Sequence, residues 1–327
     1  MYRKLLKFSI ILALVVVILG AFARLSDAGL GCPDWPGCYG QILVPDLADG
    51  TQIEGYERPL EVAKGWKEMI HRYAASTLGL VILILWLLVL RGKTQRFQSM
   101  TLPSFTVLFV ILQGMFGMWT VTLMVHPGIV TTHLIGGFTT SALLFWLYLN
   151  QNNPISTYRR HILKRHKYLL LLSLLVLSIQ IILGGWTSTN YAALSCGDQF
   201  PTCLNSWWPD MDFSKALYWG PIGTEHDYEY GVLENEARAA IQMIHRIGAL
   251  ITTIILASLI FSLRRYNHLK NYRLAIGGLL VAQISLGILN VILSLPMTLA
   301  VLHNALALLL LLSIISLIHK IFKSNNQ

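Results

Sequence analysis

Residues 68–90 read EMIHRYAASTLGLVILILWLLVL, and this stretch decides the class of fold. Its second half, residues 78–90, has no charged side chain, whereas its first half carries Glu68, His71 and Arg72. An apolar helix of about 20 residues is long enough to cross the roughly 30 Å hydrocarbon core of a bilayer. The stretch therefore predicts a membrane-spanning helix with ionisable side chains near one end.

Similar apolar runs recur along the 327-residue chain. The predicted spans are 5–24, 70–90, 103–122, 128–148, 167–187, 240–263, 273–293 and 297–319. The composition agrees, because 54% of the residues are hydrophobic and only 13% are charged, about half the charged share of a soluble domain. The sequence predicts an all-α membrane protein with eight transmembrane helices, and it excludes a soluble enzyme, a disordered protein and a small disulfide scaffold.

The charged residues divide the connections into two kinds. All 16 Asp and Glu lie within residues 27–68 and 198–236, whereas Lys and Arg dominate the termini and the other connections. Short loops rich in Lys and Arg stay in the cytoplasm. The net charge of +9 therefore indicates topology and a lipid bilayer as partner, with no nucleic acid. We expect both termini to be cytoplasmic and the long acidic loops to lie on the outer face.

The second half of the chain repeats motifs of the first. The corresponding pairs are Leu19-Gly20 with Leu183-Gly184, Glu68-x-x-His71-Arg72 with Gln242-x-x-His245-Arg246, Gln113-x-x-x-Gly117 with Gln283-x-x-x-Gly287, and His133 with His303. Such a repeat predicts a duplicated unit of four helices.

The predicted domains are two tandem four-helix bundles, residues 1–155 and 156–327. Because each unit has an even number of helices, both insert in the same orientation, related by a pseudo-two-fold axis along the membrane normal. The first apolar run, with Ala21-Phe22-Ala23, could also be a cleaved signal peptide. The repeat argues against cleavage, because the fifth helix would then have no counterpart.

Four histidines lie near the outer ends of predicted spans: His71, His133, His245 and His303. Ionisable side chains inside a bilayer are costly and usually face a functional interior. Two histidines on facing helices of a bundle can bind a haem iron from both sides. The pattern predicts one haem site in each half; the alternative is a set of interhelical hydrogen-bond donors.

Glu68 distinguishes the two predicted sites. It precedes His71 by three residues, so both project from one face of a helix. The matching residue of the second half is Gln242, which carries no charge. This difference suggests a reactive haem in the first half and a haem that only carries electrons in the second. The alternative is an acid favoured by the dipole at the start of a helix.

Three arginines lie at the outer ends of predicted helices: Arg24, Arg72 and Arg246. Guanidinium groups pair well with carboxylates, and a haem carries two propionates. We expect Arg24 and Arg72 to serve the first-half haem and Arg246 to serve the second. The alternative is that these side chains reach for the interface and mark helix ends.

The four cysteines form two close pairs in the predicted outer loops, Cys32 with Cys38 and Cys196 with Cys203. An extracytoplasmic compartment permits disulfides, and the matching placement in both halves favours two local bridges. A redox role for one pair stays open. A tetrahedral metal site built from all four cysteines is the other alternative.

These residues resemble the haem A synthase family. The stretch GAFARLSDAGLGCPDWPGC, residues 20–38, is similar to that family's first-loop signature. The remaining matches are Glu68-x-x-His71-Arg72, His133, His245-Arg246 and His303. The resemblance covers the whole chain. It implies an oxidoreductase that oxidises a ring methyl of haem O to a formyl group through two successive hydroxylations, in haem A biosynthesis for terminal oxidases.

The resemblance also implies roles for individual residues. The implied ligand pairs, for the substrate haem O and for a b-type haem respectively, are His71 with His133 and His245 with His303. Glu68 carries over as the catalytic carboxylate. Cys32–Cys38 carries over as the functional pair, and Cys196–Cys203 as a structural disulfide.

Two other functions stay open on the histidines alone. One is a di-haem b-type electron carrier that oxidises quinol, and the other is a haem chaperone or exporter without turnover. The expected partners are haem O, a haem O synthase that supplies it, and an unidentified electron acceptor. A bacterial inner membrane is the expected location, because no Arg- and Ser-rich presequence precedes the first helix.

Overall fold

The computed structural model describes residues 1–94, 99–152, 164–220 and 227–323, and over these residues it contains helices and loops with no β-strand. Eight helices are long and apolar enough to cross a membrane: α1 (Tyr2–Leu25), α2 (Val62–Leu90), α3 (Thr101–Thr122), α4 (Pro127–Asn152), α5 (Lys164–Thr189), α7 (Asn235–Ser262), α8 (Lys270–Ile292) and α9 (Met297–Lys323). The predicted all-α membrane fold with eight spans is confirmed.

Two helices begin well before the predicted spans. Helix α2 begins at Val62 instead of residue 70, and α7 begins at Asn235 instead of residue 240. The added turns of α2 carry Met69, which packs with buried loop residues around Cys32 and Cys38. Hydropathy marks only the part of a helix that lies in lipid, whereas contacts with a loop support the turns beyond it.

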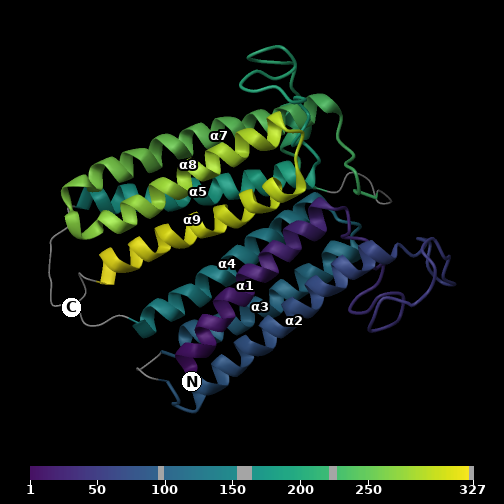
Figure 1. The fold of residues 1–327 in the computed structure, drawn as a ribbon, viewed down its shortest axis with the longest axis horizontal. Helices are drawn as coiled ribbons and strands as arrows, with labels where there is room; N and C mark the ends of the chain where they lie inside the picture. The colour runs from purple at the N-terminus through teal and green to yellow at the C-terminus, as the bar shows by residue number, and fades with distance from the viewer. Residues whose placement is uncertain (95–98, 153–163, 221–226, 324–327) are drawn as a thin grey trace.

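The helices form two bundles (Figure 1). In the first, α1 and α3 each contact α2 and α4; in the second, α5 and α8 each contact α7 and α9. The halves join through contacts of α1 with α9, α4 with α5 and α4 with α9. Exchanging the halves reproduces this set of contacts, while the pseudo-two-fold axis itself stays a prediction. The predicted boundary at residues 155 and 156 lies outside the described residues.

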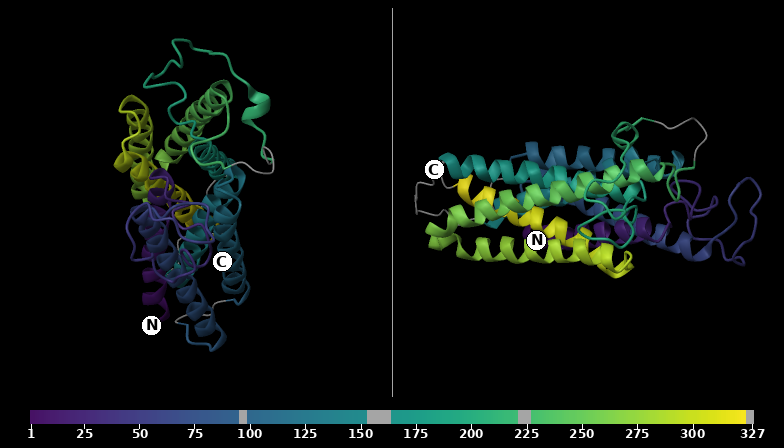
Figure 2. Two further views of the ribbon diagram at one scale, coloured as in Figure 1. Left: turned by 90° about the vertical axis from the view of Figure 1, so that its right-hand side faces the viewer. Right: turned by 90° about the horizontal axis from the view of Figure 1, so that it is seen from above.

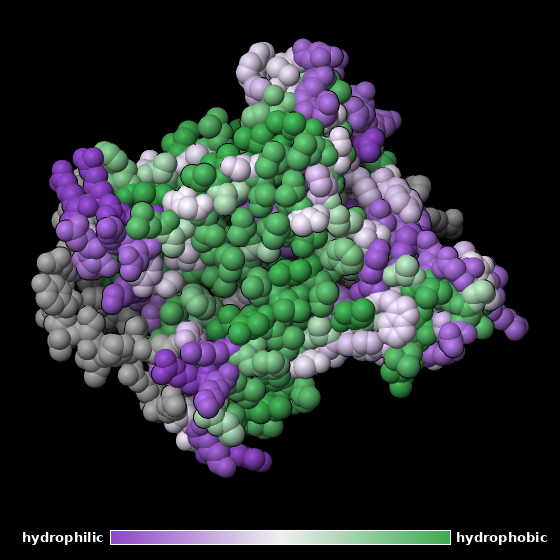
Figure 3. Space-filling view, viewed as in Figure 1, coloured by the Kyte–Doolittle hydropathy of each residue, from purple (hydrophilic) through white to green (hydrophobic). Residues whose placement is uncertain are grey.

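The long connections lie at one end of the helices. Residues 26–61 and 190–212 project from that end, and the start of α1 and the end of α9 lie at the opposite end (Figure 2). Apolar side chains cover the middle of the face seen in Figure 3, and hydrophilic side chains gather at both ends. A bilayer requires this distribution, because lipid tails cannot solvate polar groups.

The largest apolar core cluster crosses the interface between the bundles. It joins Leu256, Leu308 and Ile314 of the second half with Val17 and Phe138 of the first. A second cluster fills the first bundle at the end opposite the long loops. These clusters fix the helices that carry the four histidines.

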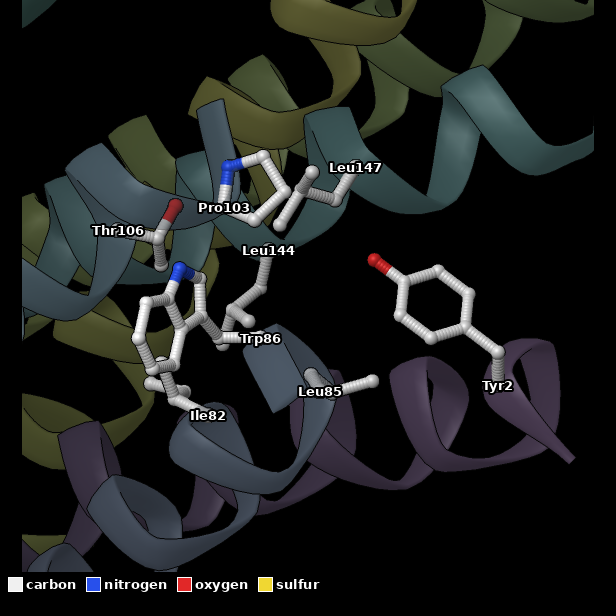
Figure 4. Close-up of a pocket in the computed structure, with 8 residues that line it drawn as sticks. All are labelled: Tyr2, Ile82, Leu85, Trp86, Pro103, Thr106, Leu144 and Leu147. Atoms are coloured by element: carbon white, nitrogen blue, oxygen red, sulfur yellow. The ribbon is translucent and has the colours of Figure 1, made fainter. Parts of the chain in front are cut away.

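A small pocket lies within that second cluster, between α1, α2, α3 and α4 (Figure 4). Its lining is mostly apolar and consists of Tyr2, Ile82, Leu85, Trp86, Pro103, Thr106, Leu144 and Leu147. Ile82 and Leu144 follow His71 and His133 by eleven residues, which places the pocket about 16 Å further along the helices. None of the predicted site residues lines it.

Candidate functional site

The structure brings the four predicted histidines together in two pairs. His71 on α2 and His133 on α4 are close enough for their charges to interact, and so are His245 on α7 and His303 on α9. Helices α2 and α4 are diagonal members of their bundle, because α1 and α3 each contact both of them. Each pair therefore faces across the interior of a bundle, the arrangement that holds a haem between two imidazoles.

Each histidine ring packs against a glycine of the helix before it. A Cβ atom built on Gly20 would lie 2.9 Å from Cε1 of His71, and the other three glycines would each bring a Cβ to 3.2 Å from a histidine Cε1. The pairs are Gly20 with His71, Gly117 with His133, Gly184 with His245, and Gly287 with His303. Close packing against glycine therefore positions all four rings.

Three of the histidines also contact a glutamine from that preceding helix. Nε2 of Gln180 lies 3.0 Å from Nδ1 of His245 and donates to the carbonyl oxygen of His245 at 3.0 Å. Gln113 makes the same two contacts with His133, at 3.1 and 2.6 Å.

The third glutamine, Gln283, makes a single contact. Its Nε2 lies 3.2 Å from Nε2 of His303. Sequence reasoning noted Gln113 and Gln283 as repeat markers but missed Gln180. The signal was present, because Gln180 precedes Gly184 by the same four residues.

Unpaired polar atoms around the rings fit haem ligands. Nδ1 of His71 and His303 and Oε1 of Gln180 and Gln283 are buried without a hydrogen-bond partner. A histidine that ligates iron through Nε2 donates its Nδ1–H to an acceptor, which an amide oxygen can provide. No group of three or more His, Cys, Asp or Glu could hold a metal ion within the described residues. Two protein ligands suffice for a haem iron.

Glu68 lies beside the first histidine pair, as its spacing predicted. It is 7% exposed, its charge interacts with His71, and its Oε1 accepts a hydrogen bond from Nε of Arg72 at 3.0 Å. In the second half, Oε1 of Gln242 and Nε of Arg246 are buried without partners. A buried ion pair next to the histidine is thus present only in the first half.

Arg72 and Arg246 also bind the loops that contain the cysteines. Nη1 of Arg72 donates to the carbonyl oxygen of Gly37 at 2.5 Å, and Nη1 of Arg246 donates to that of Thr202 at 2.9 Å. The two guanidinium groups therefore connect equivalent loops to the N-terminal parts of α2 and α7. Their contact with propionates stays a prediction.

Arg24 reaches from the first half to the second. Its Nη2 donates to the carbonyl oxygen of Ser188 at 2.6 Å, and its guanidinium lies 4.1 Å from the ring centroid of Tyr191. The hydroxyl of Tyr191 donates to Asp27 at 2.7 Å, and burial raises the pKa of this hydroxyl to about 12. The hydroxyl therefore stays protonated at physiological pH. Arg24 joins the halves here, and its propionate contact stays a prediction.

Both predicted disulfides are present, Cys32–Cys38 and Cys196–Cys203. All four residues are at most 1% exposed. Each disulfide is next to a short antiparallel bridge, between Cys38 and Gln41 or between Cys203 and Ser206. Because every cysteine is in a disulfide, no thiolate remains for the alternative four-cysteine metal site.

These features define a polytopic helical membrane protein with a facing pair of histidines in each of two four-helix bundles. Residues 3–315 match the family model of the cytochrome oxidase assembly proteins, COX15-CtaA, and the chain belongs to this family.

The relatives agree over most of their length. A haem A synthase of Shewanella oneidensis is 43% identical over 318 residues, which are 96% of this chain and 94% of that protein. Haem A synthases of Halalkalibacterium halodurans and Neorickettsia sennetsu are each 25% identical, over 83% and 95% of this chain and 80% and 96% of their own. The family resemblance read from the motifs is confirmed.

Proposed function

We propose that this chain converts haem O to haem A by oxidising one ring methyl to a formyl group. Two findings support the proposal: membership of the family, and relatives named haem A synthase. The structural observation that carries it is Glu68, a buried carboxylate beside one histidine pair, with Gln242 beside the other. The two halves then have different tasks on one framework.

In this proposal the first half binds the substrate. His71 and His133 ligate the iron of haem O between α2 and α4, and the reacting methyl lies near Glu68. The second half binds a b-type haem through His245 and His303, and this cofactor supplies a one-electron carrier when it is bound. The facing rings and their glycine contacts support both assignments.

The reaction requires two hydroxylations of the same carbon. The first converts the methyl to an alcohol, and the second gives a hydrated aldehyde that loses water to become the formyl group. With water as the source of the hydroxyl oxygen, each hydroxylation replaces one C–H bond by a C–O bond and releases two protons and two electrons, and the electrons pass to the unidentified electron acceptor. Glu68 is placed to accept a proton or to stabilise positive charge that develops at the carbon, and Arg72 fixes the orientation of the carboxylate. Gln242 cannot take up a proton in the same way.

We also propose that both termini are cytoplasmic and that the cysteine loops lie outside, in a bacterial inner membrane. The basic termini, the acidic loops and their separation to opposite ends support this orientation. A haem O synthase as supplier and an acceptor for the electrons complete the set of partners.

Pigment analysis tests the proposed function. Membranes that contain the chain together with a source of haem O are extracted, and the haems are separated by chromatography and identified by mass. We expect a formyl haem in proportion to the amount of the protein. A quinol-oxidising di-haem carrier, the alternative function, would leave haem O unchanged. Two haems bound without any formyl product would overturn the proposal.

A further inference from the structure

The helix in front of each histidine carries one short motif, and α1 departs from it. Helices α3, α5 and α8 carry a glutamine four residues before the glycine that packs on the ring. The three motifs are Gln113 with Gly117, Gln180 with Gly184, and Gln283 with Gly287. On α1 the position four residues before Gly20 is Val16. Only His71 therefore has no side-chain amide beside it, and its contact with α1 is a hydrogen bond to the backbone of Val16.

The residue three positions after the histidine also differs at His71. A Cβ atom on Gly248 would lie 2.3 Å from Oε1 of Gln180, so a larger residue there would displace this amide. The same holds for Gly136 beside Gln113, where a Cβ would lie 1.8 Å from Oε1. Both glycines follow their histidine by three residues, and the residue three after His71 is Ala74. The His71 site thus lacks both the side-chain amide and a glycine at this position, whereas His303 has the amide Gln283 but is followed three residues later by Leu306.

The missing amide changes how the ring is held. Nδ1 of His71 is buried and has no hydrogen-bond partner, whereas Nδ1 of His245 has Gln180 at 3.0 Å; Nδ1 of His303 also has no partner, but Gln283 contacts the other nitrogen of that ring at 3.2 Å. In the structure the amide nitrogen of Gln180 faces Nδ1 of His245; with its oxygen turned to the ring, the amide would accept the Nδ1–H of a histidine that ligates iron through Nε2. Such outer contacts orient the ring and make it a stronger ligand, and their loss typically costs about 10- to 100-fold in metal affinity.

We propose that Gln180 is a positioning residue that locks His245 onto the resident haem, and that Val16 and Ala74 make His71 a releasable ligand. The inference rests on the proposed function. It gives a functional role to the difference between His71 and the other three histidines. A cofactor must stay bound through many turnovers, whereas a substrate must leave after each one. Haem O would enter and haem A would leave when His71 dissociates from the iron. His133 would keep its orientation meanwhile, because Gln113 contacts its ring and its carbonyl oxygen.

The rate of haem loss from the second half tests the proposed role of Gln180. Full-length protein in detergent is loaded with haem, and haem loss to excess apomyoglobin is followed by absorbance. We expect Gln180→Val to speed loss from the second half by about 10- to 100-fold. Gln180→Glu keeps an acceptor oxygen, so it is expected to retain haem at the wild-type rate and to lower the reduction potential. A general folding defect would not separate these two variants.

The rate of haem loss from the first half tests the proposed roles of Val16 and Ala74. The double variant Val16→Gln, Ala74→Gly introduces the amide together with its space, and we expect haem to leave the first half about 10-fold more slowly. Conversion in a single turnover is expected to persist, while repeated turnover slows because the product stays bound. Ala74→Gly alone provides the space without the amide, and it is not expected to slow haem loss.

The outcomes separate this inference from the proposed function. Equal rates of haem loss in wild type, Gln180→Val and the double variant would overturn the inference, even if the wild type makes the formyl product. A wild type without formyl product would overturn the proposed function, while the rates of haem loss would still report on the amides. Gel filtration of every variant verifies that the protein is intact, and Gln180→Glu carries the test if Gln180→Val does not fold.

Discussion

The two bundles share their framework and differ around one histidine. Both have histidine rings packed on glycines, an arginine bound to the carbonyl oxygens of a cysteine loop, and a buried disulfide. The differences gather near His71 and its counterpart. They are Glu68 against Gln242, Val16 against Gln180, and Ala74 against Gly248.

This distribution separates fold from function. The shared contacts hold four helices around a pair of histidines in both halves. The three differences change the charge, the hydrogen bonding and the space around the ring of His71. The helix contacts of the bundle are the same in both halves. Two copies of a unit can therefore share one fold while only one of them carries a buried carboxylate beside a histidine and lacks the side-chain amide.

The largest effect is expected from removing the charge that distinguishes the halves. Glu68→Gln copies the second half, and under the proposed role of this carboxylate in each hydroxylation, formyl haem should fall by about 10²- to 10⁴-fold. Haem content should stay near the wild-type level, because the histidines are unchanged. The measurement is chromatography of extracted haems, normalised to protein.

The matched control for this variant is Gln242→Glu. It places a carboxylate beside the second pair, where no substrate binds, and formyl haem should still be made. Full conversion by Glu68→Gln with normal haem content would contradict the role of Glu68.

A smaller effect is expected from crowding the rings. Gly184→Val places methyl groups where Cε1 of His245 lies, and Gly20→Val does the same at His71. Overpacking of this kind costs about 1–3 kcal/mol, and here it also turns the ring away from the iron. Each variant should lose the haem of its own half, seen as loss of low-spin absorption, and keep the other. Loss of both haems from one substitution would show that the bundles are not independent.

The sequence predicts the fold and the pairing of the four histidines because these are properties of local pattern. An apolar run defines a span by itself, and the repeat of His71 in His245 marks a shared role. Gln180 was missed because comparing the two halves aligns it with Val16, which hides the motif. Comparing α5 with α8 within the second half reveals the motif, because Gln180 and Gln283 each precede a glycine by four residues.

The arginine contacts could not be predicted in the same way. Arg72 and Arg246 bind backbone carbonyl oxygens, which every residue has, so no residue type in the loops marks the partner. The path of the loop decides which oxygen faces the guanidinium. The early start of α2 at Val62 has a similar cause, because packing against the loop supports its first turns.

The disulfides sharpen the comparison, because their surroundings are alike. Replacing both cysteines by serine should cost about 2–3 kcal/mol for either pair, since each closes a short loop. Thermal unfolding in detergent should then show similar losses for Cys32→Ser/Cys38→Ser and Cys196→Ser/Cys203→Ser. If Cys32–Cys38 is the functional pair, as the family resemblance implies, only its removal should lower conversion further than stability explains. Equal activity in both double variants would show that Cys32–Cys38 has a structural role only, like Cys196–Cys203.

The smallest effect is expected where the outer loops of the two halves meet. Arg58 of the first loop forms ion pairs with Asp227 and Glu229 of the second, and Asp227 is about half exposed. The exposed pair with Asp227 contributes about 0–1 kcal/mol, and Glu229, which is 7% exposed, keeps Lys64 at 3.5 Å, so Arg58→Ala should lower the unfolding temperature only slightly and leave haem content unchanged. High salt should shrink the difference from wild type, because ions screen the pairs. A large loss of haem in Arg58→Ala would mean that the loops, and not the helices alone, hold the two sites in place.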